Sequence, residues 1–183
     1  MKSFVMNKEQ RKITRNPVEN GQQADSVPLE VANQLAAVQS QIDAATDQRP
    51  LRYGVGPVTL VAVSKRQPEN KIDAALEAGQ RVFGENRVQE AIQRWTDRRK
   101  VYSDIILHLI GPLQTNKVSD AVTLFNIIEV VDRPKLAKAL SAEMICQNRQ
   151  LECYIQVNTG EEEQKSGIVP DDRFDAFKED KSD

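Results

Sequence analysis

Lys65 ends the apolar run from Val58 to Lys65, so an amine is expected where a buried strand releases the chain into a loop. In parallel α/β folds the carboxyl ends of the strands form the functional edge, and a lysine there can condense with a carbonyl group. Because side chains alternate along a strand, Lys65 shares one face with Val61 and Val63. This face is expected to be dry, and burial lowers the pKa of a lysine amine. The alternative is a solvated loop lysine, which is the usual state of a lysine that follows a strand.

The spacing of apolar residues predicts the elements that position Lys65. Apolar residues from Val31 to Ala45 recur every three or four positions, which predicts a helix that ends before Pro50. Pro68 and Gly79 are placed to begin and end the helix that follows Lys65. Further strands are predicted at 81–84, 105–110, 126–131 and 153–157, and further helices begin near 86, 114 and 134.

Five apolar strands separated by helical segments imply a parallel sheet with right-handed connections. A five-stranded doubly wound sheet fits the length of 183 residues. An eight-stranded (β/α)8 barrel needs about 250 residues and would be incomplete here. The pattern alone therefore favours the doubly wound sheet.

Composition excludes several classes of protein. The chain has a net charge of -2, with 25 Lys and Arg against 27 Asp and Glu, and 5% aromatic residues, so nucleic-acid binding is not expected. A membrane span is not expected either, because no apolar stretch is long enough. One histidine argues against a metal cluster. Cys146 and Cys153 lack a C-x-x-C spacing and are interpreted as buried apolar residues in a reducing compartment.

Residues 1–28 differ from the rest of the chain. They are rich in polar residues and contain the breakers Asn16-Pro17 and Asn20-Gly21, which predicts a disordered tail ahead of a single domain at 29–183. The tail lacks the apolar core of a secretory signal, so a cytoplasmic location is expected, with organelle import as the alternative.

Several polar residues near predicted strand ends have both a functional and a structural interpretation. Asn86 follows the second strand and is also a good helix N-cap. His108 is interpreted as a hydrogen-bonded core histidine rather than an acid or base. The other positions of this kind are Gln114, Asn116, Lys117, Gln156 and Asn158.

Four segments together closely resemble one known family. They are Ala62-Val63-Ser64-Lys65, the stretch from Phe83 to Glu90, the stretch from His108 to Lys117, and the stretch from Asn158 to Gly167. In this order and spacing they resemble the pyridoxal phosphate homeostasis proteins, single-domain barrels related to the amino-terminal domain of bacterial alanine racemases. The resemblance covers most of residues 30–167. It replaces the doubly wound sheet with a (β/α)8 TIM-type barrel, of which about five strands are present.

The resemblance implies that pyridoxal 5'-phosphate is held as an aldimine on Lys65. It also implies that Asn86 lies beside the pyridine ring, and it matches Lys165 to a second motif lysine of the family. For Lys165 the alternative is a solvated side chain among Glu161, Glu162 and Glu163. The family handles and supplies the cofactor without established turnover, so the resemblance implies a protein that is not an enzyme and whose partners are the cofactor and PLP-dependent apoenzymes.

The chain departs from the family pattern after Gly167. Residues 168–177 can open a helix and the last six residues are charged or Ser, so no sixth to eighth strand is expected. The family's contacts to the phosphate and the pyridine nitrogen lie in that region. We therefore expect a C-terminally truncated member with reduced cofactor affinity. The alternatives are a flavodoxin-like module that binds without a covalent bond, and an inactive remnant of a racemase-like enzyme.

Overall fold

The computed structural model describes residues 19–50, 56–160, 162 and 164–169. The helices are α1 (Glu19–Asp47), α2 (Glu69–Glu77), α3 (Val88–Trp95), α4 (Arg98–Val101), the 3-10 helix η2 (Thr115–Lys117), α5 (Val118–Leu124) and α6 (Pro134–Cys146). The strands are β1 (Ala62–Val63), β2 (Val82–Glu85), β3 (Ile106–Leu109), β4 (Ile127–Val131) and β5 (Glu152–Ile155). Each predicted strand is confirmed, although β1 is much shorter than the apolar run that predicted it.

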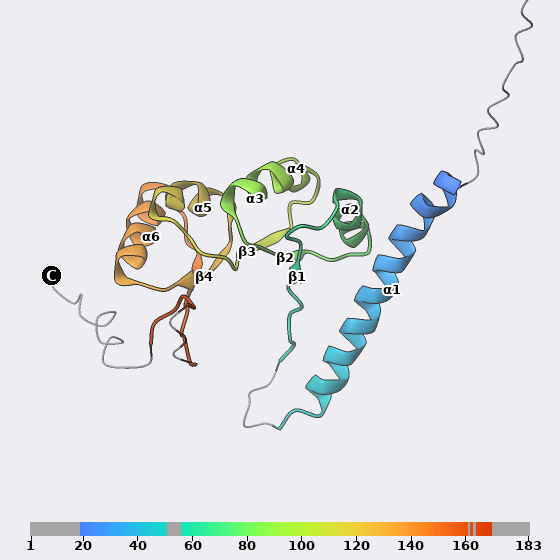
Figure 1. Cartoon of the computed structure of the whole chain (residues 1–183), viewed down its shortest axis with the longest axis horizontal. Helices are drawn as coiled ribbons and strands as arrows, with labels where there is room; N and C mark the ends of the chain where they lie inside the picture. The colour runs from blue at the N-terminus through green and yellow to red at the C-terminus, as the bar shows by residue number, and fades with distance from the viewer. Residues whose placement is uncertain (1–18, 51–55, 161, 163, 170–183) are drawn as a thin grey trace, which may run out of the picture.

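The five strands form one parallel sheet in the order β1-β2-β3-β4-β5. Each new strand is added to the same edge, so right-handed connections place the helices on one side of the sheet (Figure 1). A doubly wound sheet would reverse its strand order at a switch point. The doubly wound sheet favoured by the pattern is therefore wrong, as is the flavodoxin-like alternative. The strand order agrees with the partial barrel that was expected.

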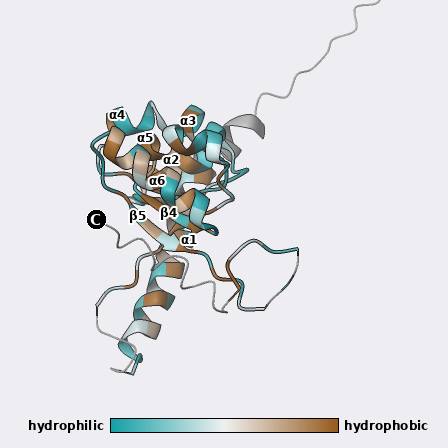
Figure 2. Cartoon of the chain, turned by 90° about the vertical axis from the view of Figure 1, so that its left-hand side faces the viewer, coloured by the Kyte–Doolittle hydropathy of each residue, from teal (hydrophilic) through white to brown (hydrophobic). Residues whose placement is uncertain are grey.

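The hydrophobic core lies between the sheet and its helices. Phe83 and Leu107 are buried on the strand side, and Trp95 and Leu136 are buried on the helix side. The rings of Phe83 and Trp95 lie 4.6 Å apart between centroids. Figure 2 shows helices α2 to α6 gathered on one side of β4 and β5, with hydrophobic and hydrophilic residues alternating along them. The periodicity of the helices predicted this core, including Ile72 and Leu76.

The opposite face of the sheet is the inner face of the partial barrel, and no described helix covers it. Because Val63 pairs with Gly84, and Gly84 with His108, these residues form one row across the inner face. Val63, Ile106 and Tyr154 on this face remain exposed. All residues of β5 are exposed as well, because this strand has a neighbouring strand on one side only. The structure thus presents an open apolar surface.

Helix α1 lies at the β1 end of the sheet and contacts α2 (Figure 1). Val31 and Leu35 pack against the core, as the periodicity predicted. The helix begins at Glu19 and includes Pro28, so residues 19–28 of the predicted tail are helical. The helix continues through Pro28 because packing of its later turns against the core stabilises it. Residues 1–18 lie outside the described residues. Among the described helices none is long and apolar enough to cross a bilayer.

Three local predictions can be compared with the structure. Gly79 has φ of 94° and ends α2, as predicted. The N-cap of α3 is Arg87 rather than Asn86, and no side chain caps this helix, so the capping interpretation of Asn86 is wrong. Cys146 and Cys153 are both exposed, which also contradicts the prediction. Cys146 is the last residue of α6, and Cys153 lies on the edge strand β5, whose residues are all exposed.

Candidate functional site

Lys65 lies in a four-residue turn directly after β1. The backbone N–H of Gln67 donates to the carbonyl oxygen of Ser64 at 3.1 Å, which closes the turn. Arg66, between them, has φ of 61°, a left-handed conformation that residues with a side chain rarely adopt. The side chain of Lys65 is exposed. The dry environment expected from the sequence is therefore not provided by the described residues.

Lys65 and Asn86 line the same hollow at the carboxyl ends of β1 and β2, with a volume of about 300 Å³. The other lining residues are Arg66, Arg87 and Glu90. Arg87 and Glu90 form an exposed ion pair at 3.0 Å. The hollow thus combines one amine and one amide with two guanidinium groups and one carboxylate, and its cations suit an anionic carbonyl compound. Pyridoxal phosphate has an aldehyde for the amine and a phosphate for the cations, so these residues fit it.

The backbone of Asn86 is in close contact with the loop that follows β3. A Cβ atom at Gly111 would stand 2.3 Å from the carbonyl oxygen of Asn86, so only glycine fits there. Gln114 and Lys117 line a neighbouring hollow together with Asn86. Asn116 is exposed. Of the three polar residues after the third strand, two are therefore close to the site.

Lys165 lies in a loop that returns to β5. Asn158 is buried, and its amide nitrogen donates to the carbonyl oxygen of Glu162 at 2.9 Å. The backbone N–H of Ile168 donates to Gln156 at 2.8 Å, and that of Asn158 to Ile168 at 2.9 Å, so the loop is closed at its base. Lys165 forms an ion pair with Glu162. It lines a separate hollow with Ile110, Pro112 and Gln156, so the structure does not bring it into the hollow of Lys65.

His108 lies on the inner face of the sheet, below the carboxyl ends of the strands. Its Nδ1 lies 2.6 Å from a carboxylate oxygen of Glu129 on the neighbouring strand. The ring is buried, so the hydrogen-bonded core histidine expected from the sequence is present. The partner residue, Glu129, was not predicted.

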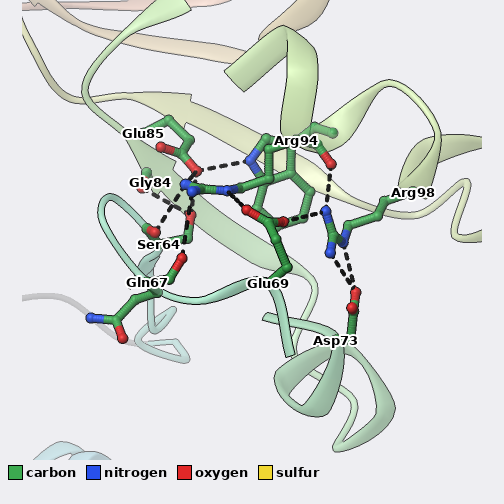
Figure 3. A network of polar contacts seen from close by, with 9 residues as sticks. Ser64, Gln67, Glu69, Asp73, Gly84, Glu85, Arg94 and Arg98 are labelled. Atoms are coloured by element: carbon green, nitrogen blue, oxygen red, sulfur yellow. Dashed lines mark hydrogen bonds and ion pairs between the residues drawn. The ribbon is translucent and has the colours of Figure 1, made fainter. Parts of the chain in front are cut away.

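A buried polar network on the helix side of the sheet was also not predicted (Figure 3). Its centre is Glu85, which is fully buried at the end of β2. One carboxylate oxygen accepts from the Ser64 hydroxyl at 2.7 Å, Arg94 at 2.9 Å and the Trp95 indole at 3.0 Å. No group of the described residues donates to the other oxygen. The sequence signal that could have revealed the burial of Glu85 is the alternation of side chains along the strand, which places Glu85 on the same face as the core residue Phe83.

Arg94 connects this network to the surface. Its Nε donates to Glu69 at 3.1 Å, and Glu69 also pairs with Arg98, which in turn binds Asp73 (Figure 3). Burial alone would lower the pKa of the Arg94 guanidinium, but the hydrogen bonds and charges of Glu85 and Glu69 outweigh it and raise that pKa. The guanidinium therefore remains charged and forms a buried ion pair with Glu85.

Residues 49–182 match the family model described as "Alanine racemase, N-terminal domain". The chain is 35% identical over 151 residues to the pyridoxal phosphate homeostasis protein of Pasteurella multocida, covering 82% of this chain and 64% of that protein. It is 37% identical over 142 residues to the protein of the same name from Escherichia coli K12, covering 76% of this chain and 59% of that protein. The chain thus spans about three fifths of the length of these relatives.

Solved structures of PipY from Synechococcus elongatus PCC7942 are similar in fold. The structure without PLP has a TM-score of 0.69 and 36% identity, and covers 81% of this chain and 63% of PipY. The structure with PLP bound has a TM-score of 0.65 and 35% identity, and covers 81% of this chain and 62% of PipY.

Proposed function

Because the chain belongs to the pyridoxal phosphate homeostasis proteins, which have the alanine racemase N-terminal domain, we propose that it binds pyridoxal 5'-phosphate as an aldimine on Lys65. The observation that carries the proposal is the position of Lys65. It lies in the turn directly after the first strand of the partial barrel and shares a hollow with Asn86, two guanidinium groups and the carboxylate of Glu90. PipY, a relative of similar fold, has been solved with PLP bound.

The reaction that forms the bond needs only the amine and the aldehyde. The Lys65 nitrogen adds to the aldehyde carbon, the carbonyl oxygen leaves as water, and a carbon–nitrogen double bond remains. Asn86 is proposed to lie beside the pyridine ring, because it stands next to Lys65 in the hollow. Lys165 is proposed as a second cofactor contact on the opposite side of the same edge.

We propose that the 183-residue chain binds the cofactor more weakly than full-length relatives do. In barrels of this kind the phosphate is usually held by loops after strands seven and eight and by a helix N-terminus. The described residues form five strands, so they supply none of these loops. The two arginines of the hollow are solvated or already paired, and exposed ion pairs contribute little.

The proposed activity is handling of the cofactor for PLP-dependent apoenzymes rather than turnover of a substrate. A racemase requires a second acid–base group opposite the lysine. In the described hollow of Lys65 the one carboxylate, Glu90, is paired with Arg87. An amino-acid racemase assay that showed turnover dependent on Lys65 would contradict this proposal.

Spectral titration of the chain with pyridoxal phosphate tests the cofactor proposal. We expect an imine absorbance band that is absent from Lys65→Ala. Borohydride reduction followed by peptide mass spectrometry should place the pyridoxyl group on Lys65. Labelling spread evenly over exposed lysines, such as Lys71 and Lys135, would contradict the proposal. Tight stoichiometric binding, equal to that of a full-length relative in the same titration, would contradict the reduced affinity alone.

A further inference from the structure

The buried network ends on the backbone of the turn that carries Lys65. The carbonyl oxygen of Ser64, directly before Lys65, accepts two hydrogen bonds. One comes from the N–H of Gln67 within the turn at 3.1 Å, and the other from Nη1 of Arg94 in α3 at 3.0 Å. Both acceptor positions of this carbonyl are therefore used, one from inside the turn and one from outside it.

The same nitrogen of Arg94 joins this carbonyl to the buried carboxylate. Nη1 also donates to Glu85 at 2.9 Å, and that carboxylate oxygen accepts the hydroxyl of Ser64 at 2.7 Å. The side chain of Arg94 is 12% exposed and that of Glu85 is 0% exposed. A planar guanidinium held between fixed partners has little freedom to reorient. Arg94 thus connects α3, β2 and the end of β1 through one rigid group (Figure 3).

The turn needs such support from outside. Arg66 has φ of 61°, and a left-handed conformation is unfavourable for a residue with a side chain. A conformation of this kind persists when surrounding contacts hold it in place. Arg94 supplies such contacts from the helix layer, through the carbonyl oxygen of Ser64 and, at 3.5 Å, through that of Gln67.

We propose that Arg94 is a positioning residue for Lys65. By binding the Ser64 carbonyl and the Glu85 carboxylate together, it fixes the backbone from which the Lys65 amine projects into its hollow. Only the cofactor measurement below rests on the proposed function of Lys65. The structural claim concerns the turn itself and can be tested without ligand.

The chain offers a matched control four residues further along, at the start of α4. Arg98 belongs to the same network and donates to Glu69 at 2.8 Å and to Asp73 at 2.7 Å. Its remaining hydrogen bond goes to the backbone carbonyl of Arg94, so Arg98→Lys removes an arginine of the network without touching the turn. Comparison of Arg94→Lys with Arg98→Lys therefore separates positioning from general loss of stability.

The first measurement is amide hydrogen exchange of the ligand-free chain, followed by mass spectrometry. The peptide that contains Gln67 reports the hydrogen bond that closes the turn. We expect its exchange to be roughly tenfold faster in Arg94→Lys, because the local structure loses about one hydrogen bond of support. In Arg98→Lys the same peptide should exchange at the wild-type rate. Equal acceleration in both variants, or none in either, would overturn the proposal.

The second measurement follows attachment of pyridoxal phosphate. In Arg94→Lys we expect the rate of imine formation to fall roughly tenfold and the share of reduced pyridoxyl label on Lys65 to fall relative to other lysines. Arg98→Lys should match wild type in both respects. If wild type never labels Lys65, the proposed function fails, while the difference in exchange still decides the positioning of the turn.

A second variant covers the case in which Arg94→Lys does not fold. The double variant Glu85→Gln/Arg94→Gln removes both buried charges together, and the shorter glutamine amide cannot span both former partners of the guanidinium. We expect faster exchange at Gln67 in this variant as well. Wild-type exchange at Gln67 in a folded double variant would overturn the proposal.

Discussion

A side chain at Gly111 would collide with the backbone of Asn86, since a Cβ there would stand 2.3 Å from the Asn86 carbonyl oxygen and 2.7 Å from its Cα. The loop after β3 therefore determines where the end of β2 lies. We expect Gly111→Ala to destabilise the fold by roughly 2 kcal/mol, because a backbone contact cannot move aside as a flexible side chain can. Urea unfolding measures this change. Because Asn86 must shift, affinity for pyridoxal phosphate should fall as well.

The control for this prediction is Gly160→Ala. A Cβ at Gly160 would meet only the flexible end of Glu162, at 3.2 Å. We expect a change below about 0.5 kcal/mol, as for most surface substitutions. Equal losses in the two alanine variants would show that the loop after β3 can move away from Asn86 at little cost.

The second prediction concerns the buried pair of Glu85 and Arg94. We expect Glu85→Gln to destabilise the fold by about 3 kcal/mol, because it leaves the Arg94 charge without its buried partner. The exposed pair of Arg87 and Glu90 provides the comparison, and Glu90→Gln should cost below about 1 kcal/mol. Denaturant unfolding of both variants checks this. A loss in Glu85→Gln no larger than in Glu90→Gln would mean that the buried pair contributes little net stability.

The third prediction concerns ionisation of Tyr154 on the inner face. Its hydroxyl donates to Glu152 at 2.6 Å, and this hydrogen bond, followed by the charge of Glu152, raises the pKa of the phenol. A raised pKa in the folded state means that its contribution to stability is present below the unfolded pKa and is lost as pH rises through the folded pKa. Spectrophotometric titration should show that Tyr154 ionises above the ordinary range near pH 10. Glu152→Gln should bring that titration down, and an unchanged curve would contradict the assignment.

The fourth prediction concerns the open inner face. Val63 is 46% exposed and Ile106 is 39% exposed, which leaves apolar surface in contact with water. We expect the chain to associate as its concentration rises, which light scattering can measure. Ile106→Thr should weaken association with little loss of stability. Val101→Thr, on the helix side, removes a residue that is 75% exposed and serves as the control. Equal effects of the two substitutions would rule out the inner face as the associating surface.

Local pattern predicted the elements and the placement of Lys65, because both depend on residues close together in the chain. The run that ends at Lys65 marks a strand end whatever surrounds it. The strand order could not be predicted from local pattern, since the five-strand pattern alone allowed two topologies and favoured the wrong one. Only the resemblance carried by the four segments around Lys65, Asn86, His108 and Asn158 selected the partial barrel.

The support of the site could not be predicted in the same way. Glu85 and Arg94 are nine residues apart, and Ser64 lies thirty residues before Arg94, so their contacts exist only in the folded chain. A glutamate at a strand end is usually solvated. For Asn86 the sequence left open a helix cap and a position beside the cofactor. The cap of α3 is Arg87, and Asn86 is held by its tight backbone contact with Gly111.

The loop that carries Lys165 is closed at its base by hydrogen bonds between Gln156, Asn158 and Ile168. It is therefore attached to β5, while Lys65 is attached to β1 at the far border of the same sheet. A molecule that touched both amines would act as a tether across four strand-to-strand junctions. Its affinity would then depend on the curvature of the sheet. Each strand between the two lysines would influence binding without contacting the ligand.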